Sequence, residues 1–306
     1  MSYHVPVLYE ECLSYLNIKK DAIYFDGTLG GAGHSEGILR AGGRLIATDL
    51  DIEAINNAKV RLNKPEYEGR FNLVKDNFKN FLHVLDSLGV DKIDGALLDL
   101  GISSHQIDEP TRGFSYRFDG RLDMRMNESQ KLSAYDVVNT YTEEKLANII
   151  YLYGEERFSR RIAKNIVAIR KQKPIETTLE LAQIVKQSVP MQAQKNGHPA
   201  KKTFQAIRIE VNGELDGLDK VIKDITSRLN VGGRICIITF HSLEDRIVKQ
   251  TLKEEATDCV CDKSFPICIC GHKANIKLLG KIKPTNEELA NNSRSASSTL
   301  RVGEKL

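Results

Sequence analysis

One stretch of the chain decides its fold: Ile23-Tyr24-Phe25-Asp26-Gly27-Thr28-Leu29-Gly30-Gly31-Ala32-Gly33-His34. Its first four residues predict a strand that ends in an acid, a glycine-rich turn follows, and residues 35–40 predict the start of a helix. Glycine has no Cβ and tolerates positive φ, so such a turn lets the backbone come close to a ligand. The unpaired N–H groups at the helix start add a binding surface.

A second strand, residues 44–48, ends in Asp49, which lies 19 residues after Gly30. An acid at this distance from a glycine-rich strand–turn–helix suits the hydroxyls of a nucleoside ribose. The pattern therefore predicts a nucleoside cofactor but does not identify it.

The glycine spacing bears on one alternative, a dinucleotide oxidoreductase. The G-x-G-x-x-G pattern fails in register, because Gly31-x-Gly33 is followed by Glu36 where the third glycine belongs. Spacing through Gly37 could be a variant of that pattern. An oxidoreductase and a tight turn that binds nothing both stay open at this point.

Composition bounds the class of protein. The 306 residues are 41% hydrophobic and 28% charged, as in an ordinary globular chain of one large or two smaller domains. No apolar run approaches the roughly 18 residues that span a bilayer, and the first residues lack a signal-peptide pattern, so we expect a cytoplasmic protein. The net charge of +3 is too small to indicate a nucleic-acid partner without local clustering.

Strand and helix patterns alternate through about the first 100 residues, which predicts an α/β fold with a parallel sheet covered by helices on both faces. From residue 110 to about 126 the chain is loop-like, and from 133 to 190 its periodicity is helical without a convincing strand. A long helix over 203–229 then leads to Gly232-Gly233-Arg234 and a fifth strand. We therefore expect a helical insertion between two strands of the sheet. The expected strands are 23–26, 44–48, 71–74, 95–99 and 235–240, and the expected helices of the first part are 51–62 and 80–88.

The fourth expected strand ends in Asp99-Leu100-Gly101-Ile102-Ser103-Ser104. Open α/β folds bind ligands at the carboxyl ends of their strands. Asp99 could accept hydrogen bonds there from an amine of a nucleobase or a substrate. The alternative is that Asp99 caps a turn.

Two basic regions follow. In residues 111–126 arginines alternate with aromatic residues, which suits phosphate contacts combined with base stacking; the alternative is a structural loop whose aromatics cover the core of the insertion. Residues 157–173 hold basic side chains of which two pairs are spaced i, i+4 on one helix face, with few acids between them, which favours nucleic-acid binding over a merely solvated face. These basic residues are Arg157, Arg160, Arg161, Lys164, Arg170, Lys171 and Lys173.

The chain has six cysteines. Cys12 and Cys236 are expected to be isolated core residues. The other four form a C-x-C-x6-C-x-C cluster, which in a cytoplasmic protein favours metal binding or reduced thiols over disulfides. The spacing is not the usual C-x2-C pair of structural zinc sites. Bound zinc and reduced thiols in a β-hairpin both stay open, and no metal ligand is assigned. The cluster consists of Cys259, Cys261, Cys268 and Cys270.

Further motifs in chain order complete a pattern that resembles the RsmH (MraW) family, ribosomal RNA small subunit methyltransferases that methylate cytosine N4 of bacterial 16S rRNA with S-adenosylmethionine. The resemblance runs nearly end to end, and the cysteine cluster is not among the family's general motifs. The motifs are His4-Val5-Pro6-Val7-Leu8 and residues 26–35, 98–104, 112–115, 122–126, 153–158, 203–208 and 240–246.

The resemblance implies a class I S-adenosylmethionine-dependent methyltransferase fold, Rossmann-like with a mostly parallel sheet, and an inserted all-helical domain. It implies a methyltransferase core in residues 1–108 and 203–306 and an RNA-recognition insertion in 109–202. The turn amides would face the methionine part of the cofactor, Asp49 the ribose hydroxyls and Phe78 the adenine ring; Asp51 is an alternative to Asp49. The implied cofactor-binding residues are Ala32, Gly33, His34, Asp49, Phe78, Asp99 and Gln106.

The implied reaction is an in-line displacement from a sulfonium to an exocyclic amine, for which the enzyme aligns the reacting atoms and excludes water. Cytosine N4 is a poor nucleophile, so a hydrogen-bond acceptor near the amine would help, and the base would be unstacked into the pocket. DNA amino-methyltransferases carry (D/N/S)-P-P-(Y/F/W) at the corresponding strand end, whereas this chain has Asp99-Leu100-Gly101-Ile102. Asp99, Ser103 and His241 are candidates, and no catalytic residue is assigned.

The implied partner is 16S rRNA within the small ribosomal subunit, where the family methylates one cytidine of the decoding centre. No membrane partner is expected, and a homodimer is left open. A DNA or other-RNA amino-methyltransferase is the first alternative, disfavoured by the absent Pro-Pro pair and the basic insertion. The second is a non-catalytic RNA-binding ribosome assembly factor, disfavoured by the intact Gly30, Gly33, Asp49 and Asp99.

Overall fold

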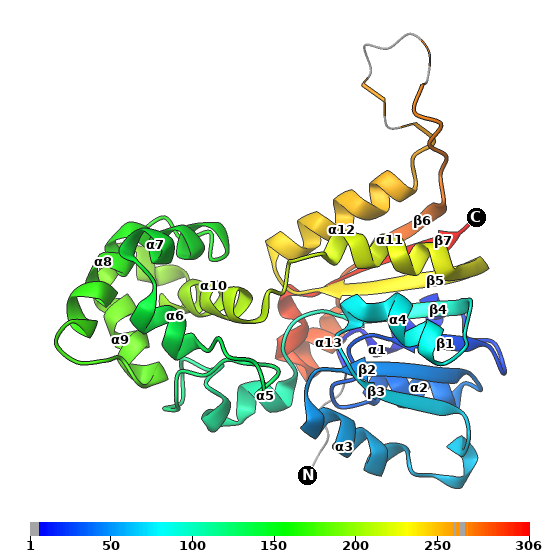
Figure 1. Ribbon diagram of the computed structural model, residues 1–306, viewed down its shortest axis with the longest axis horizontal. Helices are drawn as coiled ribbons and strands as arrows, with labels where there is room; N and C mark the ends of the chain where they lie inside the picture. Colours follow the sequence, from blue (N-terminus) through cyan, green and yellow to red (C-terminus); the bar gives the residue numbers. More distant parts are fainter. Residues whose placement is uncertain (1–5, 260, 263–266, 268) are drawn as a thin grey trace. The chain divides into compact units, whose positions relative to one another are not determined.

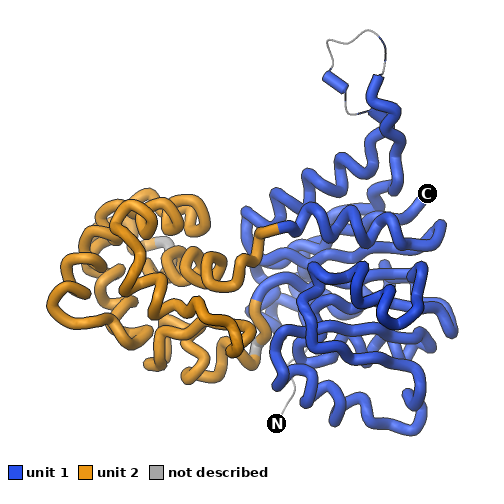
Figure 2. Tube along the Cα trace, in the orientation of Figure 1, with its two compact units in different colours: residues 1–101, 217–306 blue, residues 102–216 orange. Residues whose placement is uncertain are grey.

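The computed structural model describes residues 6–259, 261–262, 267 and 269–306. The chain forms two compact units, Met1–Gly101 with Gly217–Leu306, and Ile102–Asp216 (Figure 2). Within the described residues, no helix combines the length and the apolar character needed to cross a membrane.

The first unit is built on a seven-stranded sheet with the order β3-β2-β1-β4-β5-β7-β6 (Figure 1). Strands β1 to β5 are parallel to one another, and β7 runs antiparallel between β5 and β6. This mostly parallel sheet confirms the expected class I Rossmann-like fold. The strands are β1 (Ile23–Asp26), β2 (Arg44–Asp49), β3 (Phe71–Lys75), β4 (Ile93–Asp99), β5 (Leu229–Thr239), β6 (Ile276–Ile282) and β7 (Thr299–Lys305).

Helices cover both faces of this sheet, as predicted, because neighbouring strand residues point to opposite faces. Tyr24 and Leu45 belong to one apolar core with residues of α1, α2 and α3, and Phe25 and Ile46 belong to the other with residues of α4, α11 and α12. Cys12 and Cys236 are buried in the first of these cores, which confirms their expected place. The helices and 3-10 turns of this unit are α1 (Tyr9–Leu16), α2 (Gly33–Arg40), α3 (Ile52–Leu62), η1 (Pro65–Tyr67), η2 (Phe78–Asn80), α4 (Phe81–Ser87), α11 (Leu218–Arg228), α12 (Ser242–Glu255), α13 (Asn286–Asn291) and η5 (Ser293–Ser297).

The second unit is helical around one apolar core of its own. Among its described residues the only β-pairing is an isolated bridge between Arg121 and Thr177, so the expected absence of strands over 133–190 agrees with the structure. Capping boxes at Ser133 and Thr177 fix the starts of two of its helices. The elements are α5 (Ser104–Asp108), η3 (Pro110–Arg112), α6 (Ala134–Thr140), α7 (Glu143–Leu152), α8 (Ser159–Arg170), α9 (Thr178–Ser188), η4 (Met191–Asn196) and α10 (Ala200–Asn212).

The long helix predicted over 203–229 is wrong. It is two helices, α10 and α11, because Gly213 and Gly217 adopt left-handed φ values of 56° and 65° and interrupt the helical hydrogen bonds. Phe204 and Ile207 of α10 pack into the core of the second unit. The predicted boundaries after residues 108 and 202 are therefore replaced by boundaries after Gly101 and Asp216.

Candidate cofactor site

The glycine-rich turn connects β1 to α2 at the edge of the sheet where parallel strands end. Ala32 is buried with a left-handed φ of 58° and directly precedes the helix. Its N–H donates to the carbonyl of Leu29 (2.7 Å), and the N–H of Leu29 donates to the carbonyl of Thr48 (3.1 Å). The turn is thus held by the neighbouring strand, and its shape does not depend on a ligand.

Asp49 fixes this turn to the end of β2. Its Oδ2 accepts from the N–H of Gly30 (2.8 Å), and its Oδ1 accepts from the N–H of Asp51 (2.8 Å). Burial raises the pKa of Asp49 to about 6, against the lowering effect of these hydrogen bonds. Each carboxylate oxygen has two lone pairs, so both can also accept from a ribose hydroxyl.

Asp51, the alternative to Asp49, serves the adjoining helix. It is the N-cap of α3, and its Oδ1 accepts from the N–H of Glu53 (2.9 Å). Capping of this kind stabilises a helix start by about 1 kcal/mol. The geometry therefore favours Asp49 as the acid of the predicted site.

Asp26 and Thr28 join the ends of β1 and β4, although the sequence had not singled them out as site residues. The buried carboxylate of Asp26 accepts from Ser35 Oγ (2.7 Å) and from the N–H of Thr28 (3.0 Å). Thr28 Oγ1 in turn accepts from the N–H of Asp99 (2.6 Å). The available signal was that strands β1, β2 and β4 each end in aspartate.

Asp99 carries an unsatisfied carboxyl oxygen at the end of β4. Its Oδ1 is buried and has no hydrogen-bond partner in the part of the chain that the structure describes. Burial, with the nearby carboxyls of Asp26 and Glu244, raises the pKa of Asp99 to about 8. A buried acceptor without a partner is costly and indicates a position where a ligand donor would bind.

Phe78 lies beside the start of the turn. It opens η2 directly after β3, where the side chain of Asn77 caps the backbone. A Cβ on Gly27 would lie 2.9 Å from Phe78 Cβ and 2.4 Å from Leu98 Cδ2. Glycine at position 27 thus allows β1, Phe78 and β4 to approach closely.

His34 contributes to the turn by its backbone, because its imidazole is committed elsewhere. Nε2 lies 3.1 Å from the carbonyl oxygen of Val7, and the ring packs against Tyr9 with centroids 5.9 Å apart. Burial lowers the pKa of His34 to about 4, so the neutral ring donates to Val7. Gly33 also faces this segment, since a Cβ there would lie 2.2 Å from Pro6 Cγ. His4 and Val5 of the same motif lie outside the described residues.

Six of the seven predicted cofactor residues belong to the first unit and lie at the carboxyl ends of β1 to β4 or in the turn. Gln106 belongs to the second unit, five residues after Gly101. It forms a capping box with Ser103: the N–H of Gln106 donates to Ser103 Oγ (3.2 Å), and the N–H of Ser103 donates to Gln106 Oε1 (3.1 Å). Contact of Gln106 with the cofactor stays a prediction.

The candidate catalytic residues Ser103 and His241 both begin helices. Ser103 is the N-cap of α5, and His241 precedes α12. Glu244 Oε1 accepts from the N–H of His241 (2.9 Å), and Glu244 Oε2 lies 3.2 Å from the Nε2 of the same histidine. Of the three candidates, Asp99 alone has a side chain that no helix cap uses.

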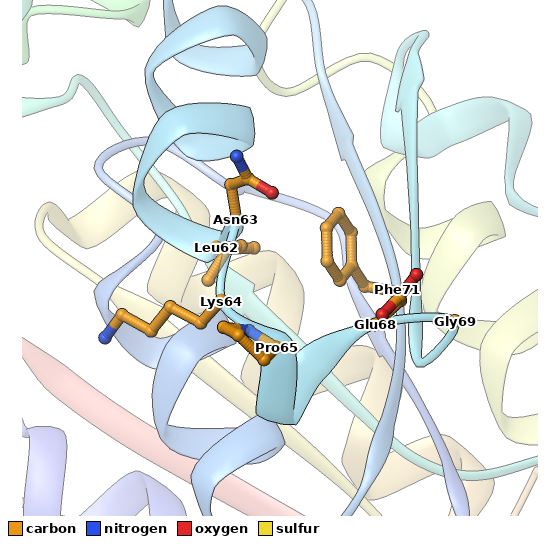
Figure 3. Close-up of a pocket in the computed structure, with 7 residues that line it drawn as sticks. All are labelled: Leu62, Asn63, Lys64, Pro65, Glu68, Gly69 and Phe71. Carbon is orange, nitrogen blue, oxygen red and sulfur yellow. The ribbon is translucent and has the colours of Figure 1, made fainter.

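A surface pocket in the first unit lies elsewhere, in the connection between α3 and β3 (Figure 3). This connection leads into the start of β3, so the pocket lies at the opposite edge of the parallel strands from Asp49 and Asp99. Lys64 at its rim is paired with Glu36 at 2.5 Å. We therefore do not assign the cofactor to it. Its lining residues are Leu62, Asn63, Lys64, Pro65, Glu68, Gly69 and Phe71.

The arginine-rich loop of the second unit is partly structural. Buried Arg112 donates through NH2 to the carbonyls of Arg125 (3.1 Å) and Met126 (3.3 Å). Arg125 forms a bidentate pair with Asp123 (2.8 and 2.7 Å). Phe114 is buried in the core of the unit. These residues therefore have a structural role, as the alternative to nucleic-acid contact predicted.

The exposed basic and aromatic residues of the same loop are Arg117, Phe118 and Arg121. Arg117 lies over the ring of Tyr116 at 5.9 Å, and Tyr116 stacks on His198 with centroids 4.6 Å apart. An exposed cation beside stacked rings suits contact with nucleic acid.

The basic residues in and around α8 also divide into those with structural partners and those that are exposed. Arg170 is committed to the carbonyls of Val138 (2.6 Å) and Tyr141 (2.5 Å). Lys173 is paired with Glu180 at 2.9 Å. Within the described residues of the second unit, five basic side chains are exposed and form no ion pair: Arg157, Arg160, Arg161, Lys164 and Lys171.

Comparison with known proteins identifies the family. The profile described as the MraW methylase family matches residues 1–306. A protein named ribosomal RNA small subunit methyltransferase H from Lachnospira eligens is 53% identical over 309 residues, covering 99% of this chain and 98% of that protein. Proteins of the same name from Clostridioides difficile and Fusobacterium nucleatum are also 53% identical, each covering 99% of this chain and 99% and 97% of their own lengths. The chain belongs to the MraW methylase family.

Proposed function

We propose that this protein transfers a methyl group from S-adenosylmethionine to the exocyclic N4 amine of one cytidine in 16S rRNA within the small ribosomal subunit. The family and the names of its relatives support the class of substrate. The single observation that carries the cofactor site is the buried, unpartnered Oδ1 of Asp99 beside a preformed glycine-rich turn.

The residues present fit this cofactor. The amides at the start of α2 suit the carboxylate of the methionine part, because a helix N-terminus favours anions. Asp49 suits the ribose hydroxyls, and Phe78 offers a ring for the adenine. Asp99 Oδ1 suits an amine donor of the cofactor, and the family resemblance adds Gln106 as a further proposed contact. When bound, S-adenosylmethionine supplies an electrophilic methyl group on sulfur.

The protein's own task is then to position the base and exclude water. The target cytidine has to leave its stack to reach the sheet edge, as in other base-modifying enzymes. Arg117, Phe118 and Arg121, with the exposed cations of α8, suit the phosphates and bases of the RNA around it.

Incubation of the purified protein with methyl-labelled S-adenosylmethionine tests the proposal. We expect label on small ribosomal subunits, and nucleoside analysis should place it in N4-methylcytidine. Naked 16S rRNA and DNA serve as comparison substrates. Label found on DNA alone, or nowhere despite measurable cofactor binding, would contradict the proposal.

A substitution tests the cofactor site separately. We expect Asp99→Ala to abolish binding of S-adenosylmethionine in calorimetry, because it removes the acceptor at the strand end. Asp94→Asn is the matched control: it changes an acid on the same strand at the other edge, where Asp94 Oδ2 accepts from the N–H of Ile23 (2.9 Å). Unchanged affinity of Asp99→Ala would remove Asp99 from the site.

A further inference from the structure

The segment between α12 and β6 gathers three thiols in one place. The sulfur atoms of Cys259, Cys261 and Cys270 all lie within 4.8 Å of one another, and Cys259 Sγ and Cys270 Sγ are 3.9 Å apart. A disulfide bond would need about 2.05 Å. Two thiolates of a tetrahedral zinc ion, each about 2.3 Å from the metal, lie about 3.8 Å apart. The separation of Cys259 Sγ and Cys270 Sγ therefore fits a shared metal ion and not a disulfide.

Backbone N–H groups point at two of these sulfurs. The N–H of Ile269 donates to Cys261 Sγ (3.4 Å), and the N–H of His272 donates to Cys270 Sγ (3.4 Å). Such bonds stabilise the thiolate form that binds metal and orient the ligand atoms. These hydrogen bonds would stabilise the same thiolates when a metal is bound.

The described apolar side chains of the segment add little to its stability. Ile267 and Ile269 are 75% and 73% exposed, so these apolar side chains do not form a core. The described residues between α12 and β6 contain no strand, so the β-hairpin considered for reduced thiols is absent from that part of the chain. Small segments without a core generally need a metal or a disulfide to stay ordered.

The base of the segment is closed at the end of α12. The N–H of Asn275 donates to the carbonyl of Glu255 (2.7 Å), and the imidazole of His272 lies 3.1 Å from the carbonyl oxygen of Glu254. Figure 1 shows the described residues of the segment extending beyond the ends of α12 and β6. The thiols are thus held on a short connection whose two ends are already joined.

The cluster lies at the opposite edge of the sheet from the cofactor site. Ile276 at the start of β6 pairs with Lys305, and Arg234, near the amino end of the parallel part of β5, pairs with Glu304. Asp49 and Asp99 lie at the carboxyl ends of β2 and β4. A metal at the cluster would therefore act on structure and not on methyl transfer.

We propose that Cys259, Cys261 and Cys270 bind one structural zinc ion that orders the connection between α12 and β6. The three thiolates supply the ligands that zinc prefers. Cys268 lies outside the described residues, and the proposal does not depend on it. The proposed metal site is independent of the proposed RNA substrate, and it goes beyond the sequence, which assigned no metal ligand.

Metal analysis of the full-length protein tests the proposal. We expect about one zinc ion per chain after purification with zinc and without chelator, and at least a tenfold loss of zinc when Cys259, Cys261 and Cys270 are all changed to serine. Cys12→Ala, which removes a thiol outside the cluster, should keep the ion. Zinc below stoichiometry in the wild type, or equal zinc in the triple variant, would overturn the proposal.

Two measurements on the wild type avoid dependence on the triple variant's folding. Cobalt substitution should give thiolate-to-metal charge-transfer absorption and intense tetrahedral d–d bands. Chelator should increase hydrogen exchange in residues 269–275 while leaving β1 to β4 protected. A Cys259–Cys270 disulfide in the zinc-treated protein, or exchange that does not respond to chelator, would contradict a structural zinc ion.

Discussion

Two segments were predicted to contact ligands: the glycine-rich turn of the first unit and the arginine-rich loop of the second unit. Their side chains are arranged differently. In the turn, Gly30 and Asp49 are joined by a hydrogen bond that shapes the predicted binding edge. In the loop, Arg112 and Arg125 turn inward to carbonyls and to Asp123. A guanidinium binds a carbonyl, a carboxylate or a phosphate with the same donors, so composition alone does not distinguish structural from RNA-binding arginines.

The largest effect expected from this comparison is that of Gly27→Ala. The added Cβ would lie 2.4 Å from Leu98 Cδ2 and 2.9 Å from Phe78 Cβ, so β1, β4 and Phe78 must move apart. We expect a loss of about 1–3 kcal/mol in the free energy of unfolding, as for overpacked cores, and loss of measurable cofactor binding. Urea unfolding and calorimetry provide the two measurements.

Gly31→Ala is the matched control for stability. A Cβ at Gly31 meets no atom within 4 Å, and its φ is not in the left-handed region. The free energy of unfolding should stay within about 0.5 kcal/mol of the wild type. An equal loss in both variants would show that the turn tolerates no side chain for reasons other than close approach to Phe78 and Leu98.

Arg112→Ala is expected to have the next largest effect, on stability and not on chemistry. The substitution leaves the half-buried carbonyls of Arg125 and Met126 without their donor. Hydrogen bonds to a charged group contribute about 1.5–3 kcal/mol, so we expect a loss of that size in the free energy of unfolding. Arg117→Ala on the same loop is exposed and should leave stability unchanged. Comparable destabilisation by the two substitutions would contradict the division of the loop into buried structural arginines and exposed arginines.

Asp99→Asn is expected to change how stability depends on pH. The pKa of Asp99 is about 8 in the folded chain and about 3.9 for an unfolded aspartate, so between these values the folded state holds a proton that the unfolded state releases. This contribution to stability is full below about pH 4 and is lost as the pH rises to about 8, by at most about 1.4 kcal/mol per pH unit.

Urea unfolding of the wild type and Asp99→Asn between pH 5 and 9 measures this difference. The wild type should lose stability relative to the variant as the pH rises. Asp49, whose pKa is also raised, is present in both proteins, so its effect cancels in the comparison. Parallel pH profiles would show that Asp99 is ionised in the folded state throughout.

How well each element could be predicted from sequence depends on how clearly its own residues show an apolar pattern. The five parallel strands have strong apolar patterns, so each was predicted near its observed place, although β5 begins at Leu229 and not at the predicted residue 235. Strands β6 and β7 were missed because charged and apolar residues are mixed along both of them, and β6 is a largely exposed edge strand. The break at Gly213 and Gly217 was missed because the apolar pattern continues on both sides.

The site shows a similar limit. Strand-end acids such as Asp49 and Asp99 can be read from the sequence, because parallel strands end at one edge. The link from Thr28 to Asp99 could not, because it depends on β1 lying next to β4. In the second unit, the buried role of Arg112 depends on carbonyls 13 and 14 residues away in sequence.

The smallest expected effect concerns the exposed face of α8. Arg160 and Lys164 share this face and are exposed, so their replacement by alanine should leave the free energy of unfolding unchanged. If both contact phosphates, affinity for small ribosomal subunits should fall severalfold, and the slope of log affinity against log salt should shrink by about 1–2. The double variant Lys249→Ala, Lys253→Ala removes the same charge from exposed positions of α12 in the first unit. Net charge changes equally in the two double variants, so a larger loss of affinity for the α8 pair would assign RNA contact to the second unit. Equal losses would show that the basic residues of α8 form only a solvated surface.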